Sequence, residues 1–157
     1  MDLIPNTSQS VEVHITDIST IVSLSRLVPE FSNPYPAQTY HQRIEDREHL
    51  LLAASISQQL AGFKVGYASE KEGYFYSWMG GVLPEFRRMG IAKALAEFQE
   101  KWALRKGYSH IHMKTRNMHQ NMLLFSISRD FQITHVEASD TIKENRIYLE
   151  KKLKKLT

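Results

Sequence analysis

Cysteine is absent from this sequence of 157 residues. Disulfide bonds, thiolate metal sites and a cysteine nucleophile are therefore excluded. Long hydrophobic runs are missing as well, since no apolar stretch approaches the ~20 residues that span a bilayer. The opening residues, MDLIPNTSQS, also lack the basic start and apolar core of a signal peptide. We therefore expect a cytoplasmic protein with no membrane partner.

A large excess of charge of either sign is missing too. The 20 lysines and arginines are interspersed with 17 aspartates and glutamates, which gives a net charge of +3. This balance suits an anionic small-molecule ligand but falls short of a nucleic-acid-binding signature. The one basic run, KKLKKL near the end, is short and terminal and is typical of a solvated last strand. No nucleic-acid partner is expected.

The order of apolar patterns predicts the fold class. The length suits a single domain spanning residues 1–157. Apolar residues that alternate with period two predict strands, and those spaced three and four apart predict helices. We expect an α/β (α+β) fold in which about four helices flank a mixed, largely antiparallel central sheet of about seven strands. The expected strands are residues 11–15, 49–57, 62–69, 73–83, 108–115, 131–139 and 146–153, and the expected helices are 16–27, 39–47, 91–106 and 117–130.

Two of these helices have recognisable apolar faces that should pack on the sheet. In the helix that begins after Gly90, the face consists of residues spaced four, three and four apart. In the last helix, two methionines and a phenylalanine align. The predicted inward residues are Ile91, Leu95, Phe98 and Trp102 in the first of these helices, and Met118, Met122 and Phe125 in the second.

The stretch GGVLPEFRRMGIAKAL passes from an apolar strand to an amphipathic helix through a turn that holds Arg87, Arg88 and Gly90. The first N–H groups of a helix lack intrahelical partners and, with the positive end of the helix dipole, favour an anion. Gly90 allows a ligand to approach the backbone, and the arginines offer charge-assisted donors. The turn therefore predicts a phosphate or pyrophosphate site. The alternative is that both arginines are solvated loop residues.

The two familiar phosphate motifs do not occur. Nothing in the sequence matches a Walker A run or a dinucleotide-binding G-x-G-x-x-G. An enzyme of nucleoside triphosphates and a Rossmann dehydrogenase are therefore disfavoured.

The run VLPEFRRMGIAKAL resembles the acetyl-CoA-binding motif R/Q-x-x-G-x-G/A of the GNAT superfamily of N-acetyltransferases, with Arg87, Gly90 and Ala92 at the marked positions. A strand precedes it, an amphipathic helix follows, and IHMKTRNMHQNMLLFSISRDF looks like the superfamily's second cofactor segment. The order of elements over nearly the whole chain also matches, and FYSWMGGVLPEFRRMGIAK looks like a bacterial branch. The resemblance implies a GNAT-like fold with acetyl-CoA as co-substrate.

The resemblance also implies how coenzyme A would bind. Its pyrophosphate would lie on the backbone amides of residues 88–92, and its pantetheine arm would pair like an extra strand with the backbone near Gly80, where two adjacent glycines suit a bulge. Asn117 matches a cofactor-contacting asparagine of the superfamily, although it could also cap a helix. The cofactor-binding residues expected on these grounds are Val82, Leu83, Arg87, Arg88, Met89, Gly90, Ile91, Ala92, Asn117 and Asn121.

The implied reaction is direct attack of a primary amine, from a small molecule or a peptide, on the acetyl thioester within a ternary complex. A strand amide near Gly80 would hold the developing oxyanion. Tyr76 stands at the position of a glutamate in histone acetyltransferases and could position the amine. Ser126 stands where many members have a tyrosine, and it could instead be a helix residue without catalytic role. Asp130 likewise replaces the glycine that usually ends this helix.

The acceptor side of the predicted site involves Tyr35 and Trp78 as substrate-binding candidates. Tyr35 belongs to the segment that lines the acceptor site in relatives, as does Glu30. Trp78 shares a strand face with Tyr74 and Tyr76, and such a stripe is also typical of core packing.

No metal is expected. His110 and His112 share a strand face, but no third ligand accompanies them in the sequence, so a structural or solvent-facing pair is the preferred interpretation. The sequence thus predicts an acetyl-CoA-dependent N-acetyltransferase. The alternative is a coenzyme A-binding GNAT-like module with lost or altered catalysis. A homodimer through the last strands stays open.

Overall fold

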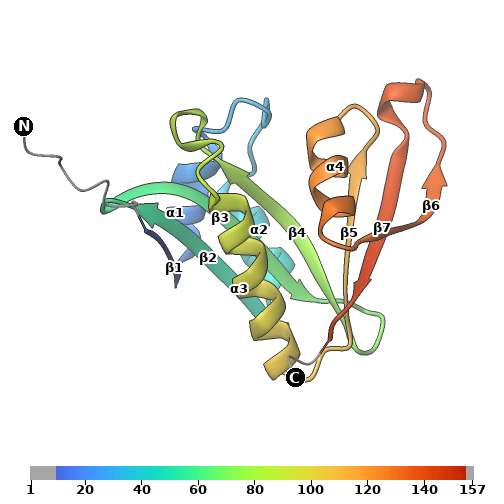
Figure 1. Cartoon of the computed structure of the whole chain (residues 1–157), viewed down its shortest axis with the longest axis horizontal. Coiled ribbons are helices and arrows are strands. Elements are labelled where there is room, and N and C mark those ends of the chain that lie inside the picture. Colours follow the sequence, from blue (N-terminus) through green and yellow to red (C-terminus); the bar gives the residue numbers. More distant parts are fainter. Residues whose placement is uncertain (1–9, 155–157) are drawn as a thin grey trace, which may run out of the picture. The chain divides into compact units, whose positions relative to one another are not determined.

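The computed structural model describes residues 10–154 (Figure 1). The first nine residues of MDLIPNTSQS and the last two residues of KKLKKL lie outside the described part. Within residues 10–154, no helix is long and apolar enough to cross a membrane.

Seven strands and four α-helices follow one another along the described chain, together with two short 3-10 helices. The strands form a sheet in the order β1-β2-β3-β4-β5-β7-β6. This mostly antiparallel sheet with its helices confirms the expected fold class. The elements are β1 Val11–Ile15, α1 Ile18–Ser25, α2 Ala37–Ile44, β2 His49–Ile56, β3 Gln59–Ala68, β4 Tyr74–Val82, η1 Pro84–Phe86, α3 Ile91–Arg105, β5 His110–Arg116, α4 Gln120–Ser128, β6 Gln132–Glu137, η2 Ile142–Glu144 and β7 Arg146–Lys152.

The chain divides into two compact units, and several elements contribute residues to both. The first unit comprises the described part of Met1–Glu45 together with Leu51–Lys64 and Gly80–Phe98. The second comprises Asp46–Leu50, Val65–Met79 and the described part of Gln99–Thr157. Strands β2, β3 and β4 and helix α3 therefore each run through both units.

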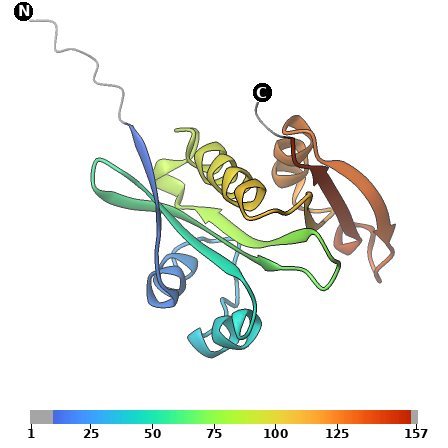
Figure 2. The same ribbon diagram turned by 90° about the horizontal axis from the view of Figure 1, so that it is seen from below.

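In the first unit, β1 pairs antiparallel with β2, from Val11 opposite Ile56 to Ile15 opposite Leu52. Helices α1 and α2 lie on one face of this part of the sheet, and the first half of α3 lies on the other (Figure 2). Strand β2 is apolar on both faces because both are covered. The fully buried core residues of this unit are Ile21, Tyr40, Leu52, Ala53, Ala54, Ala61 and Phe63.

In the second unit, β5 pairs antiparallel with β7 from His110 opposite Lys152 to Arg116 opposite Arg146. Strand β6 pairs with the other edge of β7, and α4 lies against these strands (Figure 1). The parallel pairing of β4 with β5 runs from Tyr74 to Tyr76 on β4 and ends there. Strands β4 and β5 therefore pair only at their first residues. The later residues of β5 pair with β7.

The inward face of α4 differs from the expected one. Met118 precedes the helix, and Met118 and Met122 are 44% and 39% exposed. The buried residues are instead Leu123 and Ser126, with Leu123 packing against Ile147 and Leu149 of β7. The expectation of a Met118–Met122–Phe125 inward face was wrong. The helix begins at Gln120, and its face with Leu123 and Ser126 packs on the strands.

Candidate functional site

The turn between β4 and α3 contains two residues in the left-handed backbone region. Arg88 has a φ of 64° and Gly90 has a φ of 80°. A Cβ at Gly90 would meet no heavy atom of the described chain within 4 Å, so the glycine serves the backbone conformation, and the space beside it is open. Both residues are exposed. The turn thus depends on two positive φ angles, and space is open where a Cβ of residue 90 would lie.

Helix α3 begins directly after this turn, where the sequence predicted it. The N–H of Ala94 donates to the carbonyl of Gly90 at 3.0 Å, so the amides of residues 91–93 precede the repeating helical bonds. Ile91 is 1% exposed and anchors this end in the core, whereas Ala92 is exposed. These amides and the helix dipole favour an anion at the exposed end of α3.

Arg87 contacts two protein groups of the first unit. Its Nε donates to the carbonyl of Val82 at 3.2 Å, and its Nη2 lies 2.7 Å from a carboxylate oxygen of Glu30. Two of the five donors of the guanidinium therefore fix the turn to the end of β4 and to the loop after α1. The sequence offered Arg87 as a phosphate donor and placed Glu30 beside the acceptor, with no sign that the two would pair.

Replacing Glu30 by glutamine should lower the free energy of unfolding by less than ~1 kcal/mol, because ion pairs this exposed contribute little. The two side chains are 42% and 48% exposed. Urea denaturation followed by circular dichroism measures the change, with Glu85→Gln, at an exposed glutamate in η1, as the matched control. A loss of more than ~2 kcal/mol for Glu30→Gln alone would contradict the expectation that the contact is a weak surface pair.

The glycines at the end of β4 are explained by close packing. A Cβ at Gly81 would lie 3.0 Å from Val28 Cγ2 and 3.3 Å from Phe63 Cε1, and a Cβ at Gly80 would lie 3.2 Å from the carbonyl oxygen of Phe63. Their φ angles are not in the left-handed region. The N–H of Leu83 donates to Ala61 at 2.8 Å, so that amide is engaged within the protein. These contacts fix the backbone on which the predicted oxyanion donor near Gly80 would lie.

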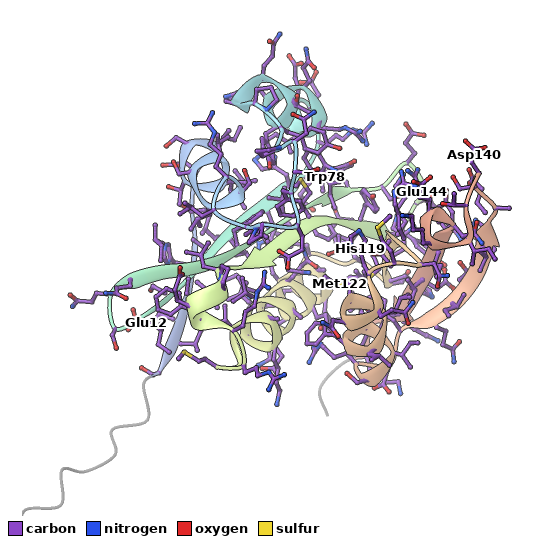
Figure 3. All side chains as sticks on the ribbon, turned by 90° about the horizontal axis from the view of Figure 1, so that it is seen from above. Glu12, Trp78, His119, Met122, Asp140 and Glu144 are labelled. Atoms are coloured by element: carbon purple, nitrogen blue, oxygen red, sulfur yellow. The ribbon has the colours of Figure 1, made fainter. Side chains whose placement is uncertain are left out.

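Asn117 joins the end of β5 to the loop before β7. Its Nδ2 donates to the carbonyl of Ile142 at 3.2 Å, and its N–H donates to Asn145 at 2.8 Å. The N-cap of α4 is His119, so Asn117 does not have the capping role that the sequence left open. Figure 3 labels His119 at the start of α4 and Glu144 in η2, which follow Asn117 and Ile142 along the chain. Asn121 lies exposed in the first turn of α4.

Ser126 is buried, and its hydroxyl lies 3.3 Å from Sδ of Met113 on β5. It therefore faces the strand beneath α4. Asp130, by contrast, adopts the left-handed conformation with a φ of 72°, as the glycine it replaces would. The N–H of Phe131 donates to the carbonyl of Ser126 at 3.1 Å, so α4 ends in the manner of a glycine-terminated helix despite the substitution.

The predicted aromatic residues of β4 belong to a row of rings in the second unit. Tyr67 of β3 contacts both Tyr76 and Trp78, with ring centroids 5.3 Å and 5.8 Å apart. Tyr76 and Trp78 are partly exposed, and Tyr67 is buried. Tyr35 lies in the first unit, is 40% exposed and contacts the ring of Tyr40 edge-on.

The structure thus gathers the predicted residues in two sets. The first unit holds Tyr35, Gly80 and the run from Val82 to Ala92, and the second holds the remaining ones. Tyr76 adjoins His112, which the sequence did not predict because the register between β4 and β5 cannot be read from either strand alone. Within residues 10–154, no group of three metal-ligating side chains gathers at one point. The second set consists of Tyr76, Trp78, Asn117, Asn121 and Ser126.

Comparison with known structures shows the same fold in several acetyltransferases. The ribosomal-protein-S18-alanine N-acetyltransferase from Escherichia coli superimposes with a TM-score of 0.78 at 12% identity, covering 94% of this chain and 97% of that one. A Bacillus subtilis acetyltransferase in complex with CoA gives a TM-score of 0.71 at 15% identity, with 92% and 99% coverage. A GNAT family acetyltransferase from Elizabethkingia anophelis with acetyl-CoA bound gives 0.72 at 18% identity, with 91% and 98% coverage.

A search of curated proteins found no significant match. The model of the Acetyltransferase (GNAT) family matches residues 19–124, which include β4, the turn with Arg87 and Gly90, α3 and β5. The match covers more than half of the chain. The protein therefore belongs to the GNAT family of acetyltransferases.

Proposed function

We propose that this protein transfers the acetyl group of acetyl-CoA to a primary amine of a small molecule or a peptide, and that the turn from Arg87 to Ala92 binds the pyrophosphate. The observation that carries the proposal is the backbone at Gly90. Its left-handed conformation and the open space beside it occur at the exposed N-terminal end of a 15-residue helix. An anion at this end of the helix would be favoured by the amides of residues 88–92 and by the helix dipole.

Acetyl transfer requires a neutral amine, hydrogen-bond donors for the oxyanion and a proton for the departing thiolate. We assign the oxyanion donor to a strand amide near Gly80. Tyr76 would orient the amine, with Tyr35 and Trp78 as candidates for acceptor contacts. The family resemblance implies further candidates for contacts with the cofactor, which are Val82, Leu83, Met89, Asn117 and Asn121.

A second candidate function is a module that binds coenzyme A without efficient catalysis. The observation that favours it concerns Ser126, which stands where many members of the superfamily have a tyrosine. Its hydroxyl is buried and directed at Met113, so the position offers no exposed acid. In the transferase, a water molecule would then deliver to the thiolate the proton that the attacking nitrogen releases.

Isothermal titration with acetyl-CoA, followed by a thiol-release assay, distinguishes the two candidates. The acceptor panel should contain polyamines, aminoglycosides, amino acids and short peptides. A peptide with an N-terminal alanine belongs in it because the Escherichia coli neighbour is named for that acceptor. Micromolar binding with thiol release on one class supports the transferase. Binding without release on any acceptor supports the module, and no binding refutes both.

A further inference from the structure

His112 occupies a central place in a row of rings on one face of the second unit. Its centroid lies 5.4 Å from that of Tyr74 and 5.4 Å from that of Tyr76, and its ring is nearly perpendicular to both. The row continues from Tyr76 to Tyr67 and from there to Trp78. A histidine in such surroundings could be a packing residue, and its polar atoms decide whether it is more than that.

The Nε2 atom of His112 is buried and has no hydrogen-bond partner in the described part of the chain. Buried polar side-chain atoms in native proteins almost always have one, so each exception requires an explanation. In His110, two residues earlier on the same face, a ring nitrogen does have a hydrogen-bond partner. Its Nδ1 lies 2.8 Å from the hydroxyl of Ser109, and its ring stacks on Tyr74.

Burial, and then two nearby lysines, favour the neutral form of the His112 ring. Burial lowers the pKa of His112, Lys71 and Lys114 lower it further, and Glu150 raises it. Lys71 lies over the ring of Tyr74 and Lys114 over that of Tyr76, while Glu150 is the cross-strand neighbour of His112 on β7. Because the pKa falls below the ordinary value of about 6.5, the ring is uncharged at neutral pH and can accept a proton.

The register places His112 where the pairing of β4 with β5 ends. His112 lies opposite Tyr76, the last residue of β4 that pairs with β5. From Tyr76, β4 continues to Trp78 and then to the two glycines near which we place the oxyanion donor. The ring that carries the unpartnered nitrogen is therefore next to that of Tyr76, the residue already assigned to orient the amine.

We propose that His112 is the general base of the acetyl transfer, and that its Nε2 accepts, directly or through one water, the proton that the acceptor amine must lose. This inference rests on the proposed function. The ammonium gives a proton to Nε2, and the freed nitrogen lone pair forms the C–N bond at the acetyl carbon. The C–S bond breaks, and its electron pair leaves with the sulfur. The nitrogen then releases a second proton, which neutralises the thiolate, and His112 returns its own proton to solvent.

The test compares His112→Phe with His110→Phe. Phenylalanine retains a ring at position 112 and removes the nitrogen, so kcat should fall about a hundredfold or more, as on removal of a general base, with the Kd for acetyl-CoA unchanged. His110→Phe, on the same face, should change kcat less than threefold. Added imidazole should partly restore a His112→Gly variant. If His112→Phe keeps the parent's kcat, His112 only packs and the proposal is refuted.

Two further measurements begin with the parent protein, so the test does not rest on His112→Phe alone. The acidic limb of the kcat/KM profile of the parent should lie below the ordinary histidine pKa and should disappear in His112→Gln. Nitrogen chemical shifts of the labelled parent at pH 7 should show a neutral ring with Nε2 unprotonated, and a protonated Nε2 overturns the proposal. A parent that binds acetyl-CoA but acetylates no acceptor refutes the proposed function as well, whereas a parent that turns over while the variant matches it refutes only the role of His112.

Discussion

A Gly90→Trp variant is expected to bind acetyl-CoA at least ~100-fold more weakly than the parent, because a bulky side chain would fill the open space beside the turn. We propose that the pyrophosphate lies there on backbone amides. Hydrogen bonds to a charged group contribute ~1.5–3 kcal/mol each, so the loss of two accounts for a change of this size. Isothermal titration gives the Kd, and circular dichroism verifies that the variant is folded.

Gly107→Trp is the matched control for this experiment. Gly107 also has a positive φ, of 97°, and a Cβ there would also meet no heavy atom of the described chain within 4 Å. It lies just beyond the other end of α3, where the helix dipole is negative. Both variants place a side chain at a positive φ, but only Gly90→Trp should lose the cofactor. Parent-like affinity in a folded Gly90→Trp would mean that the turn is not the pyrophosphate site.

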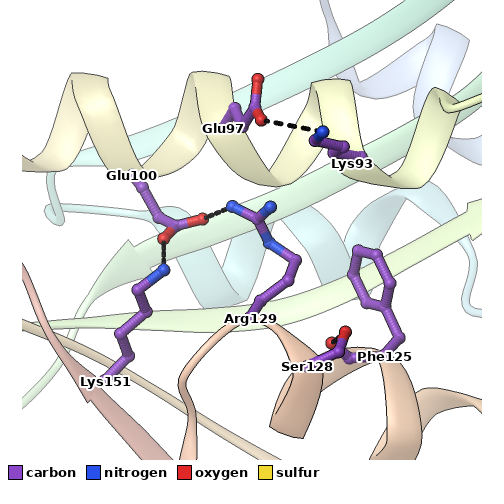
Figure 4. Close-up of polar contacts among 7 residues, drawn as sticks. All are labelled: Lys93, Glu97, Glu100, Phe125, Ser128, Arg129 and Lys151. Atoms are coloured by element: carbon purple, nitrogen blue, oxygen red, sulfur yellow. Dashed lines mark hydrogen bonds and ion pairs between the residues drawn. The ribbon is translucent and has the colours of Figure 1, made fainter.

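A Glu100→Gln variant is expected to lose ~3 kcal/mol of unfolding free energy, near the lower end of the range for breaking a buried ion pair. The carboxylate of Glu100 on α3 contacts both Arg129, after α4, and Lys151 on β7 (Figure 4). The three side chains are only 13–18% exposed. Neutralising the carboxylate would remove the negative charge that both of these partly buried cations contact. Urea denaturation of parent and variant measures the difference.

Glu97→Gln serves as the control for Glu100→Gln, since Glu97 lies one turn earlier on α3 and pairs with Lys93 (Figure 4). That pair has a 4.0 Å separation, and its side chains are 66% and 44% exposed, so its loss should cost less than ~0.5 kcal/mol. Replacing Glu100, Arg129 and Lys151 together by methionine should recover most of the stability. Equal losses for Glu97→Gln and Glu100→Gln would show that the cluster is as solvent-screened as a surface pair.

Local patterns in the sequence were sufficient for most elements of the fold. The helix expected over residues 16–27 begins at Ile18, and its cap is Asp17, whose carboxylate accepts from the N–H of Thr20 at 2.8 Å. That hydrogen bond is also the main reason why the pKa of Asp17 lies below its ordinary value. The start of α3 after Gly90 was predicted correctly as well. Capping and helix initiation depend on residues a few positions apart, so a linear pattern contains them.

In the predicted site, local features could be read from the sequence, whereas contacts between distant residues could not. The spacing of Arg87, Gly90 and Ala92 lies within one turn, and the family to which this spacing pointed was confirmed by the match to residues 19–124. The partner of Arg87, however, is Glu30, which is 57 positions away along the chain. A contact at that separation depends on how the loop after α1 packs against the end of β4, and no short motif records it.

The sequence by itself determined the order and type of the elements, the family, and the glycine-containing turn proposed to bind the cofactor, because each of these depends on residues close together in the chain. Only the tertiary structure decided which face of α4 is buried, where the hydroxyl of Ser126 is directed, and that the ring of His112, with its unpartnered nitrogen, lies beside that of Tyr76. Strand register and side-chain burial arise when distant segments pack together. The free energy of that packing is shared among residues that are not neighbours in the sequence.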